Sequence, residues 1–309
     1  MSDLIGGDRS AGGGPAGDLP EAADRRLTSG AFSSGLTVPD FAACLHMGLR
    51  PVGLVQGFCV MQWGWTGQGS IMRGTSPYST AGRSGSYSEV FRCPHGYVSA
   101  EHRSFGQNFD QPWVEQAWAQ GFGSAYGRLM EEAGEAGAHG VIGVVDTNRH
   151  LADLNVTEFH ILGTAVVVEG WDPPPGTPIW TTSLAGQRLG KLLEAGLMPV
   201  SVVAAMSSVR VWASCMTEYL MSGQAVTWGQ ATGTDEVVQI SKAHMEVRRL
   251  ARDQVRGMLG GDSLHGARLD VFERGGEDQV IEAVLRGTRV RRFKDVDPIP
   301  VPKPTVSLA

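Results

Sequence analysis

Cysteine is scarce in this sequence, and the few that occur lack the spacing that metal or disulfide scaffolds use. The four cysteines are Cys44, Cys59, Cys93 and Cys215, and no two of them stand in CxxC spacing. This pattern suggests neither a thiolate zinc knuckle nor a disulfide framework. We therefore expect free, buried thiols.

Long apolar runs are missing as well. No stretch reaches the roughly 18 uninterrupted apolar residues of a membrane span. Residues 1–26 contain no apolar run of the length that a secretory signal needs. The sequence therefore predicts a protein without a membrane span, and we expect it in the cytoplasm.

The motifs of common enzyme classes are mostly absent. The sequence has no GxSxG and no HExxH, and residues 186–191 are one residue short of phosphate-loop spacing and lack its Ser/Thr. Gly121 and Gly123 imitate a dinucleotide fingerprint, but they fall within a predicted helix rather than at a strand-to-helix turn. We expect a non-catalytic binding or scaffold protein, and the alternative is an enzyme of unknown reaction.

Glycine, by contrast, is abundant, with 42 among 309 residues, about twice its average share. Apolar residues make up 42%, which suffices for a packed interior, and the length allows two domains of ordinary size. The glycine-rich residues 1–27 are predicted to be a disordered tail. Alternating prolines in residues 295–309 favour an extended polyproline conformation, so we expect a disordered tail there too.

The strongest pattern in the chain is an internal repeat. Residues 36–52 align without a gap with residues 184–200, at a spacing of 148 residues. Each segment has apolar residues at helical spacing, then a glycine and a proline, which is typical of a short helix and its end. The runs 52–61 and 200–209 that follow are apolar and β-branched, and they predict buried strands.

A second match lies further along the chain. Residues 158–166 correspond to 282–290, with Gly163 matching Gly287 at a spacing of 124. Both segments carry a Gly-Thr pair within a predicted strand, where glycine commonly marks a bulge or a close backbone approach. Long amphipathic helices are predicted at 114–133 and 240–255, and further strands at 141–146 and 267–273.

We therefore predict an α+β fold of two tandem βαββ-type domains, each an antiparallel sheet with the long helix packed on one face. The order in each is helix, strand, long helix, strand, strand. Prolines prevent residues 173–178 from continuing a helix or sheet, so this segment is predicted to be a stiff linker. The predicted domains are residues 28–172 and 179–294.

These residues resemble the YbjQ-like family, which is named for heavy-metal binding. The resemblance rests on the long helix that runs into residues 137–144, on Asp146, on residues 163–166 and on the Gly-Arg-Ser-Gly-Ser-Tyr stretch at 82–87. The second domain keeps the Gly-Thr pair at 287–288 but has no Gly-Arg-Ser-Gly counterpart. The resemblance implies small βαββ domains that assemble into pentameric rings.

An insertion in the first domain is the predicted place of a binding site. The two spacings differ by 24 residues, 148 against 124, and the extra residues fall within 62–112. Long loops in compact domains are often functional. Cys93 and His95, with His102 as a third ligand, suit a soft or borderline metal such as zinc or copper. The alternative is an exposed turn held by Pro94.

Other histidines allow the same two interpretations. His139 and His150 flank the strand at 141–146, and His265 falls near the counterpart of His139. Each is a candidate ligand, but hydrogen bonding to backbone is the favoured interpretation. Cys44 and His46 stand two residues apart on a predicted helix and point to different faces, so Cys44 is predicted to be a core residue.

Charge differs between the two domains. Residues 28–172 carry seven Lys/Arg and thirteen Asp/Glu, whereas residues 179–294 carry fifteen and twelve. Nucleic acid could bind the basic side, but the net charge of −6 for the whole chain favours a solvated face. We expect self-association between the acidic first domain and the basic second domain of a neighbour. The basic side is formed by residues of the second long helix and of the end of the last strand, namely Arg248, Arg249, Arg252, Arg256, Arg289, Arg291, Arg292 and Lys294.

Overall fold

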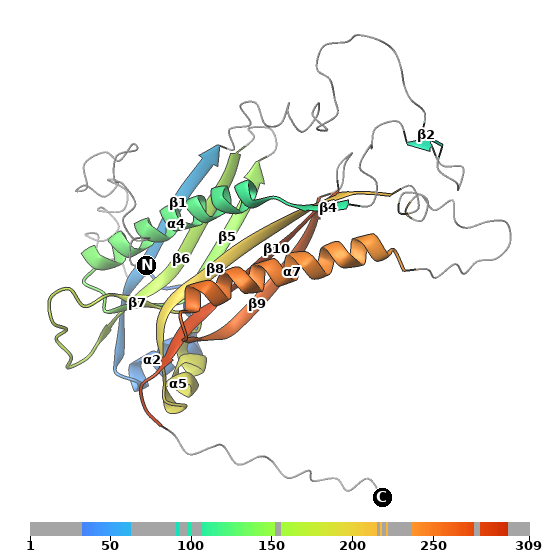
Figure 1. The fold of residues 1–309 in the computed structure, drawn as a ribbon. Coiled ribbons are helices and arrows are strands. Elements are labelled where there is room, and N and C mark those ends of the chain that lie inside the picture. The colour runs from blue at the N-terminus through green and yellow to red at the C-terminus, as the bar shows by residue number, and fades with distance from the viewer. Residues whose placement is uncertain are drawn as a thin grey trace, which may run out of the picture.

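The protein folds as an α+β structure built on two four-stranded sheets (Figure 1). Residues 28–172 are hereafter the first half and residues 179–294 the second half. The computed structural model describes residues 33–62, 91–92, 98–99, 107–151, 156–214, 217, 221, 236–274 and 279–295.

The described residues of the first half form the helices α2 and α4 and most of one sheet. The short helix α2 (Val38–His46) leads into β1 (Leu49–Gln62). The long helix α4 (Pro112–Glu135) is followed by β5 (Gly140–Leu151) and β6 (Val156–Val168). The residues described between β1 and α4 include the short strands β2 (Phe91–Arg92), β3 (Val98–Ser99) and β4 (Gln107–Asp110).

The second half repeats the order of the main elements, which confirms the prediction of helix, strand, long helix, strand, strand. Residues 173–178 contain neither helix nor strand, as predicted. The elements are β7 (Trp180–Thr181), α5 (Gly186–Glu194), β8 (Leu197–Trp212), α7 (Val238–Leu259), β9 (Ser263–Arg274) and β10 (Gln279–Arg292).

The two sheets exchange strands between the halves. The first sheet has the order β1-β6-β5-β7 and the second has the order β4-β8-β10-β9. Thus β7 of the second half joins the first sheet, in parallel with β5, and β4 of the first half joins the second sheet. The prediction of one antiparallel sheet per half is wrong in these two strands. Strands this short carry no periodic pattern, and each covers part of a sheet edge offered by the other half.

Glycines end the short helices, as the repeat predicts. Gly48 follows α2 with φ 70° and Gly196 follows α5 with φ 72°, a left-handed conformation that costs glycine little. At its start, α2 is capped by the Thr37 hydroxyl, which accepts the Asp40 N–H at 3.3 Å.

The long helices cover opposite sides of strand β8. Val203, Ala205 and Val209 share an apolar cluster with the inner face of α7. The alternate residues Val202 and Ala204, with Met206, belong instead to the cluster of α4 and the first sheet. Because successive strand residues point to opposite faces, the second sheet is buried on both sides at β8. Each long helix also lies across the strands of its own half (Figure 1).

The Gly-Thr pairs make the same contacts in both halves. Glycine is required at both, since a Cβ at Gly163 would lie 2.4 Å from Val141 and one at Gly287 would lie 2.8 Å from Leu264. Each following threonine then anchors the segment that precedes the short helix. The Thr164 hydroxyl accepts the Gly35 N–H at 3.2 Å, and the Thr288 hydroxyl accepts the Ser183 N–H at 3.0 Å.

The anchoring extends to a second pair of hydroxyls. Ser34 Oγ lies 3.3 Å from Thr164 Oγ1 and accepts the Leu36 N–H at 3.1 Å. In the second half Thr182 Oγ1 lies 3.0 Å from Thr288 Oγ1 and accepts the Leu184 N–H at 3.0 Å. The spacings of 148 and 124 residues therefore describe one recurring three-dimensional arrangement.

Replacing Thr288 by Val should lower the free energy of unfolding by about 1–3 kcal/mol, because the Ser183 N–H loses its acceptor inside the fold. Urea denaturation measures this change. The matched control is Thr147→Val at an exposed position, which should change stability by less than about 0.5 kcal/mol. Equal effects of the two substitutions would contradict the anchoring role.

Candidate functional site: the contact between the halves

The metal candidates predicted from sequence, Cys93, His95 and His102, lie outside the described residues. Their role therefore stays a prediction. Within the part of the chain that the structure describes, no group of three or more His, Cys, Asp or Glu side chains could hold a metal ion. In the same part of the chain, every helix is too short or too polar to cross a membrane.

His139 and His150, which flank the predicted strand at 141–146, have hydrogen-bond partners within the fold. His139 Nδ1 accepts the Val168 N–H at 3.0 Å, which confirms the interpretation of backbone hydrogen bonding. His150 Nδ1 lies 3.2 Å from the Thr157 hydroxyl. His265 is not the counterpart of His139, because it pairs with Thr288 as Ile142 pairs with Thr164. Counted back from this pair, the residue of the second half that corresponds to His139 is Asp262.

Helix α2 places Cys44 and His46 on different faces, as predicted. Cys44 is buried and free, whereas His46 is exposed. Burial raises the pKa of the Cys44 thiol, opposed by a backbone hydrogen bond at Gly186. Cys44 is therefore a core residue at the place where α2 meets α5.

One side of α4 holds strand β8 of the other half. The Ser208 hydroxyl donates to Gln111 Oε1 at 2.8 Å, and the Ser208 N–H donates to Glu115 Oε1 at 3.3 Å. About three turns beyond Glu115, the Tyr126 hydroxyl lies 2.6 Å from that of Thr181. Between these ends Trp118, Phe122 and Tyr126 form a stacked aromatic row, with ring centroids 5.2 and 6.0 Å apart.

An ion pair joins the two sheets beside this helix. Arg286 of β10 lies 2.8 Å from the carboxylate of Asp146 on β5 and 3.7 Å from that of Asp270 on β9. The side chains of Arg286 and Asp146 are only 20% and 9% exposed. At that depth the attraction is less screened than on an open surface.

Backbone hydrogen bonds extend the contact along the edge of β5. The Gly143 N–H donates to the Leu184 carbonyl at 3.0 Å, and the Val144 N–H donates to the Thr182 carbonyl at 2.9 Å. The Thr182 N–H donates back to the Val141 carbonyl at 2.9 Å. The second half thus begins as an added strand of the first sheet.

The short helices show that the two halves meet head to tail. In the structure Gly186 of α5 lies so close to Asp40 of α2 that a Cβ at Gly186 would be 2.3 Å from Asp40 Cα. At a spacing of 148 the counterparts of these residues are Val38 and Arg188. A two-fold relation would bring Val38 against Arg188, yet both are exposed, Val38 by 83%. The contact is therefore heterologous, and different surfaces of the repeated unit meet.

A heterologous contact leaves a free copy of each surface. Val202, Ala204 and Met206 are buried by α4 and the first sheet, but their counterparts in β1 are Leu54, Gln56 and Phe58. These lie on the side of the first sheet opposite α4, hereafter the outer face. Its large apolar side chains are partly exposed, with Phe58 at 45%, Val60 at 46% and Val145 at 58%.

The centre of the outer face is polar. His160 Nε2 lies 3.3 Å from Gln56 Oε1, and the His160 ring meets Phe58 edge to face at 6.0 Å. His160 stands where the second half has the buried Val284. Sequence reasoning missed this face, although the spacing of 148 already aligned Phe58 with Met206; only the difference in burial singles it out.

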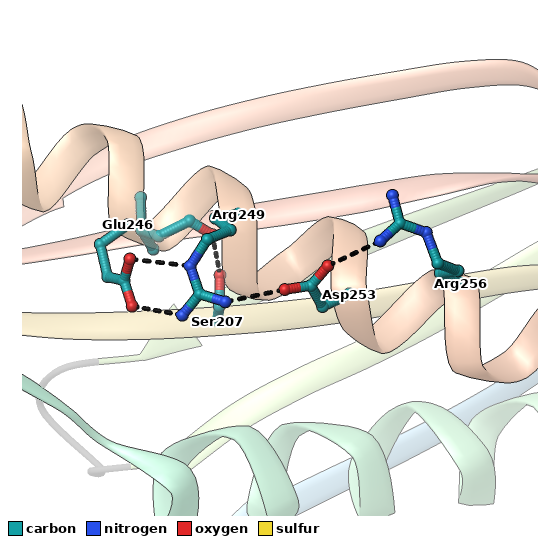
Figure 2. Close-up of polar contacts among 6 residues, drawn as sticks. Ser207, Glu246, Arg249, Asp253 and Arg256 are labelled. Carbon is teal, nitrogen blue, oxygen red and sulfur yellow. Dashed lines mark hydrogen bonds and ion pairs between the residues drawn. The ribbon is translucent and has the colours of Figure 1, made fainter.

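The exposed arginines of the second half are largely paired with neighbouring carboxylates. Figure 2 shows Arg249 between Glu246 and Asp253, and Asp253 also meets Arg256. At the end of α7, hydrogen bonds from Arg291 and Arg289 lower the pKa of Asp262 to about 2. This pairing is typical of a solvated face, which was the favoured interpretation.

Searches against family models, curated proteins and solved structures return no match.

Truncation of Arg286 to Ala should lower the free energy of unfolding by about 2–3 kcal/mol, because it leaves the Asp146 carboxylate unpaired between the sheets. Chemical denaturation of both single variants and the double variant with Asp146→Ala should give a favourable coupling energy. The control is Arg256→Ala, whose side chain is 80% exposed and whose loss should matter by less than about 0.5 kcal/mol. A coupling energy of zero would contradict a stabilising pair.

Glu115 should make the contact sensitive to pH. Burial raises the pKa of its carboxyl, with hydrogen bonds from Ser208 and Gln254 opposing and Asp110 adding to the rise. A raised folded pKa means that the contribution to stability is present at low pH and is lost as pH rises through that pKa. Glu115→Gln should therefore match or exceed the natural chain near pH 7, by less than about 1 kcal/mol, with the gain fading near pH 4. A variant whose relative stability rises toward pH 4 would contradict this assignment.

Proposed function

We propose that this protein is a non-catalytic scaffold that assembles by repeating, between chains, the contact that its two halves make within one chain. The observation that carries the proposal is the head-to-tail relation of the halves. It buries one face of the second sheet and leaves the corresponding outer face of the first sheet exposed. A heterologous contact generates a closed ring when its rotation permits, and an open filament otherwise.

The finer architecture belongs to the same proposal. Each half is one copy of a βαββ-type unit with its long helix on one face, and the recurring Gly-Thr anchors support this. The resemblance to the YbjQ-like family implies ring assembly of such units. Here two units are linked in one chain, so each chain would supply two positions of the assembly.

Exposed apolar side chains support a contact at the outer face. Phe58 and Val60 of β1 and Val145 of β5 lie on one sheet face, on either side of β6, and exposed apolar side chains gathered on one face commonly mark interaction sites. The partner that covers the outer face is a second copy of this chain, because the corresponding face of β8 is already covered by the first half within the chain. Opposite charge of the two halves favours head-to-tail contact over contact of like with like.

A bound metal or small ligand in the insertion remains part of the proposal. Cys93, His95 and His102 would hold zinc or copper, with the thiolate and imidazole ligands that these ions accept. Elemental analysis of the natural chain and of Cys93→Ala/His95→Ala tests this part separately. Loss of a stoichiometric metal in the double variant supports it, and metal-free natural protein refutes it.

Phe58→Glu should reduce the assembly to single chains, because it places a charge where a neighbour would bury an aromatic ring. Light scattering at micromolar concentration should give a multiple of 32.9 kDa for the natural chain and 32.9 kDa for the variant. The matched control is Met198→Glu, on a comparably exposed apolar side chain (41%) outside the outer face. A natural chain that is itself monomeric would refute the proposed function.

A further inference from the structure

The outer edge of β9 has no partner strand in the part of the chain that the structure describes. In the second sheet β9 is the last strand and pairs only with β10. Its counterpart in the first sheet is β5, which also pairs on one side with the strand that corresponds to β10. The other edge of β5, however, is occupied by residues from the start of the second half.

The bulges align the two edges residue by residue. Ile142 pairs with Thr164 and His265 pairs with Thr288, and a glycine with positive φ follows each, 61° at Gly143 and 63° at Gly266. Positions 143 and 144 of β5 therefore correspond to positions 266 and 267 of β9. The amides that bind the added strand at β5 have their counterparts in Gly266 and Ala267.

The matching donor strand is the segment that precedes α2. Residues 33–36 correspond to residues 181–184, and the two segments have the same hydroxyl anchors on Thr164 and Thr288. Those anchors use the N–H groups of Gly35 and Leu36. In the second half the remaining groups, the Thr182 N–H and the Thr182 and Leu184 carbonyls, are the ones that bind β5.

Residues 181–182 are more buried than their counterparts 33–34, as expected if residues 33–36 have no partner strand within their own chain. Thr181 and Thr182 are buried, whereas Ser33 is exposed and Ser34 is only partly buried. The segment 33–36 is held on its own first sheet, so the β9 edge that it fits is that of another chain.

We infer that residues 33–36 of one copy add as a parallel strand to the outer edge of β9 in a second copy. The Leu36 carbonyl would accept a hydrogen bond from the Gly266 N–H, and the Ser34 carbonyl would accept one from the Ala267 N–H. The Ser34 N–H would donate to the Leu264 carbonyl. This inference rests on the proposed function and names the backbone contact that joins consecutive chains. Edge strands are ready templates for such addition.

The contact between chains is looser than the one within the chain. At β5 the Trp180 ring lies over Gly140, where a Cβ would be 2.2 Å from the ring, but the corresponding position of β9 is Ser263. At the short helix, Val38 carries a side chain where Gly186 has none. Both differences keep a neighbouring copy further away, so the addition is expected to be reversible on dilution.

Cross-linking between two differently substituted chains tests the register. Ser33→Cys and Leu264→Cys occupy the positions that correspond to the paired Thr181 and Val141. Each substitution is made in a separate full-length chain that also carries Cys93→Ser and Cys215→Ser. The chains are then treated with a short bis-maleimide. A mixture of the two variants should give a linked pair of twice the chain mass, and neither variant alone should do so.

Ala267→Pro provides the second test, because proline lacks the backbone N–H that would donate a hydrogen bond to the Ser34 carbonyl. Ala267 lies in the bulge, outside the register with β10, so proline is expected to leave that pairing intact. The variant should sediment as a single chain with an unchanged melting curve, while Ala267→Val, which keeps the amide, should assemble. Cross-linking decides alone if the proline variant unfolds.

The two levels of the proposal fail differently. A monomeric natural chain refutes both the scaffold and the strand addition. An oligomer that gives no cross-link in the mixture, and that assembles normally with Ala267→Pro, overturns the strand addition and leaves the scaffold standing.

Discussion

Strand β8 is covered on both faces, by α7 through Val203 and Ala205 and by α4 through Val202 and Ala204. Among the residues that the structure describes, α4 covers one face of β1, the counterpart of β8, and the other face carries the exposed Phe58 and Val60. This asymmetry is the necessary result of joining two copies of a unit head to tail. The added strand at β5 likewise has a free counterpart, since the edge of β9 has no partner strand in the part of the chain that the structure describes. The Arg286–Asp146 pair is not repeated, because Leu162 and Leu269 occupy the corresponding positions.

The two long helices have diverged on the side that, in α4, contacts the other half. The helices align when the buried Gly121, Ala125, Leu129 and Ala133 are matched with the buried Ala243, Val247, Ala251 and Val255. The aromatic row Trp118, Phe122 and Tyr126 then corresponds to Ile240, His244 and Arg248. The contact within the chain is therefore aromatic and permanent. The same side of α7 is polar, with His244 hydrogen-bonded to Glu273 at 2.8 Å, and suits a contact that forms and breaks in water.

Much of the fold could be predicted from local pattern. Helical spacing, the glycines after the short helices and the Gly-Thr pairs all follow from steric rules that act within a few residues, and they appear where expected. The strands β4 and β7 could not be predicted, because their partners lie in the other half and they are too short for a periodic pattern. His265 was misplaced because no sequence match fixed the spacing of these two strands, which the register shows to be 123 residues between β5 and β9.

The outer face could not be predicted from the sequence for a different reason. Sequence alignment equates Phe58 with Met206, but only packing shows that Met206 is 4% exposed and Phe58 is 45% exposed.

Electron microscopy of the natural chain tests the proposed head-to-tail assembly most directly. The account predicts closed rings in which the repeating units number twice the chains, with alternate units equivalent. Single chains, or pairs related by a two-fold axis through the outer face, would contradict it.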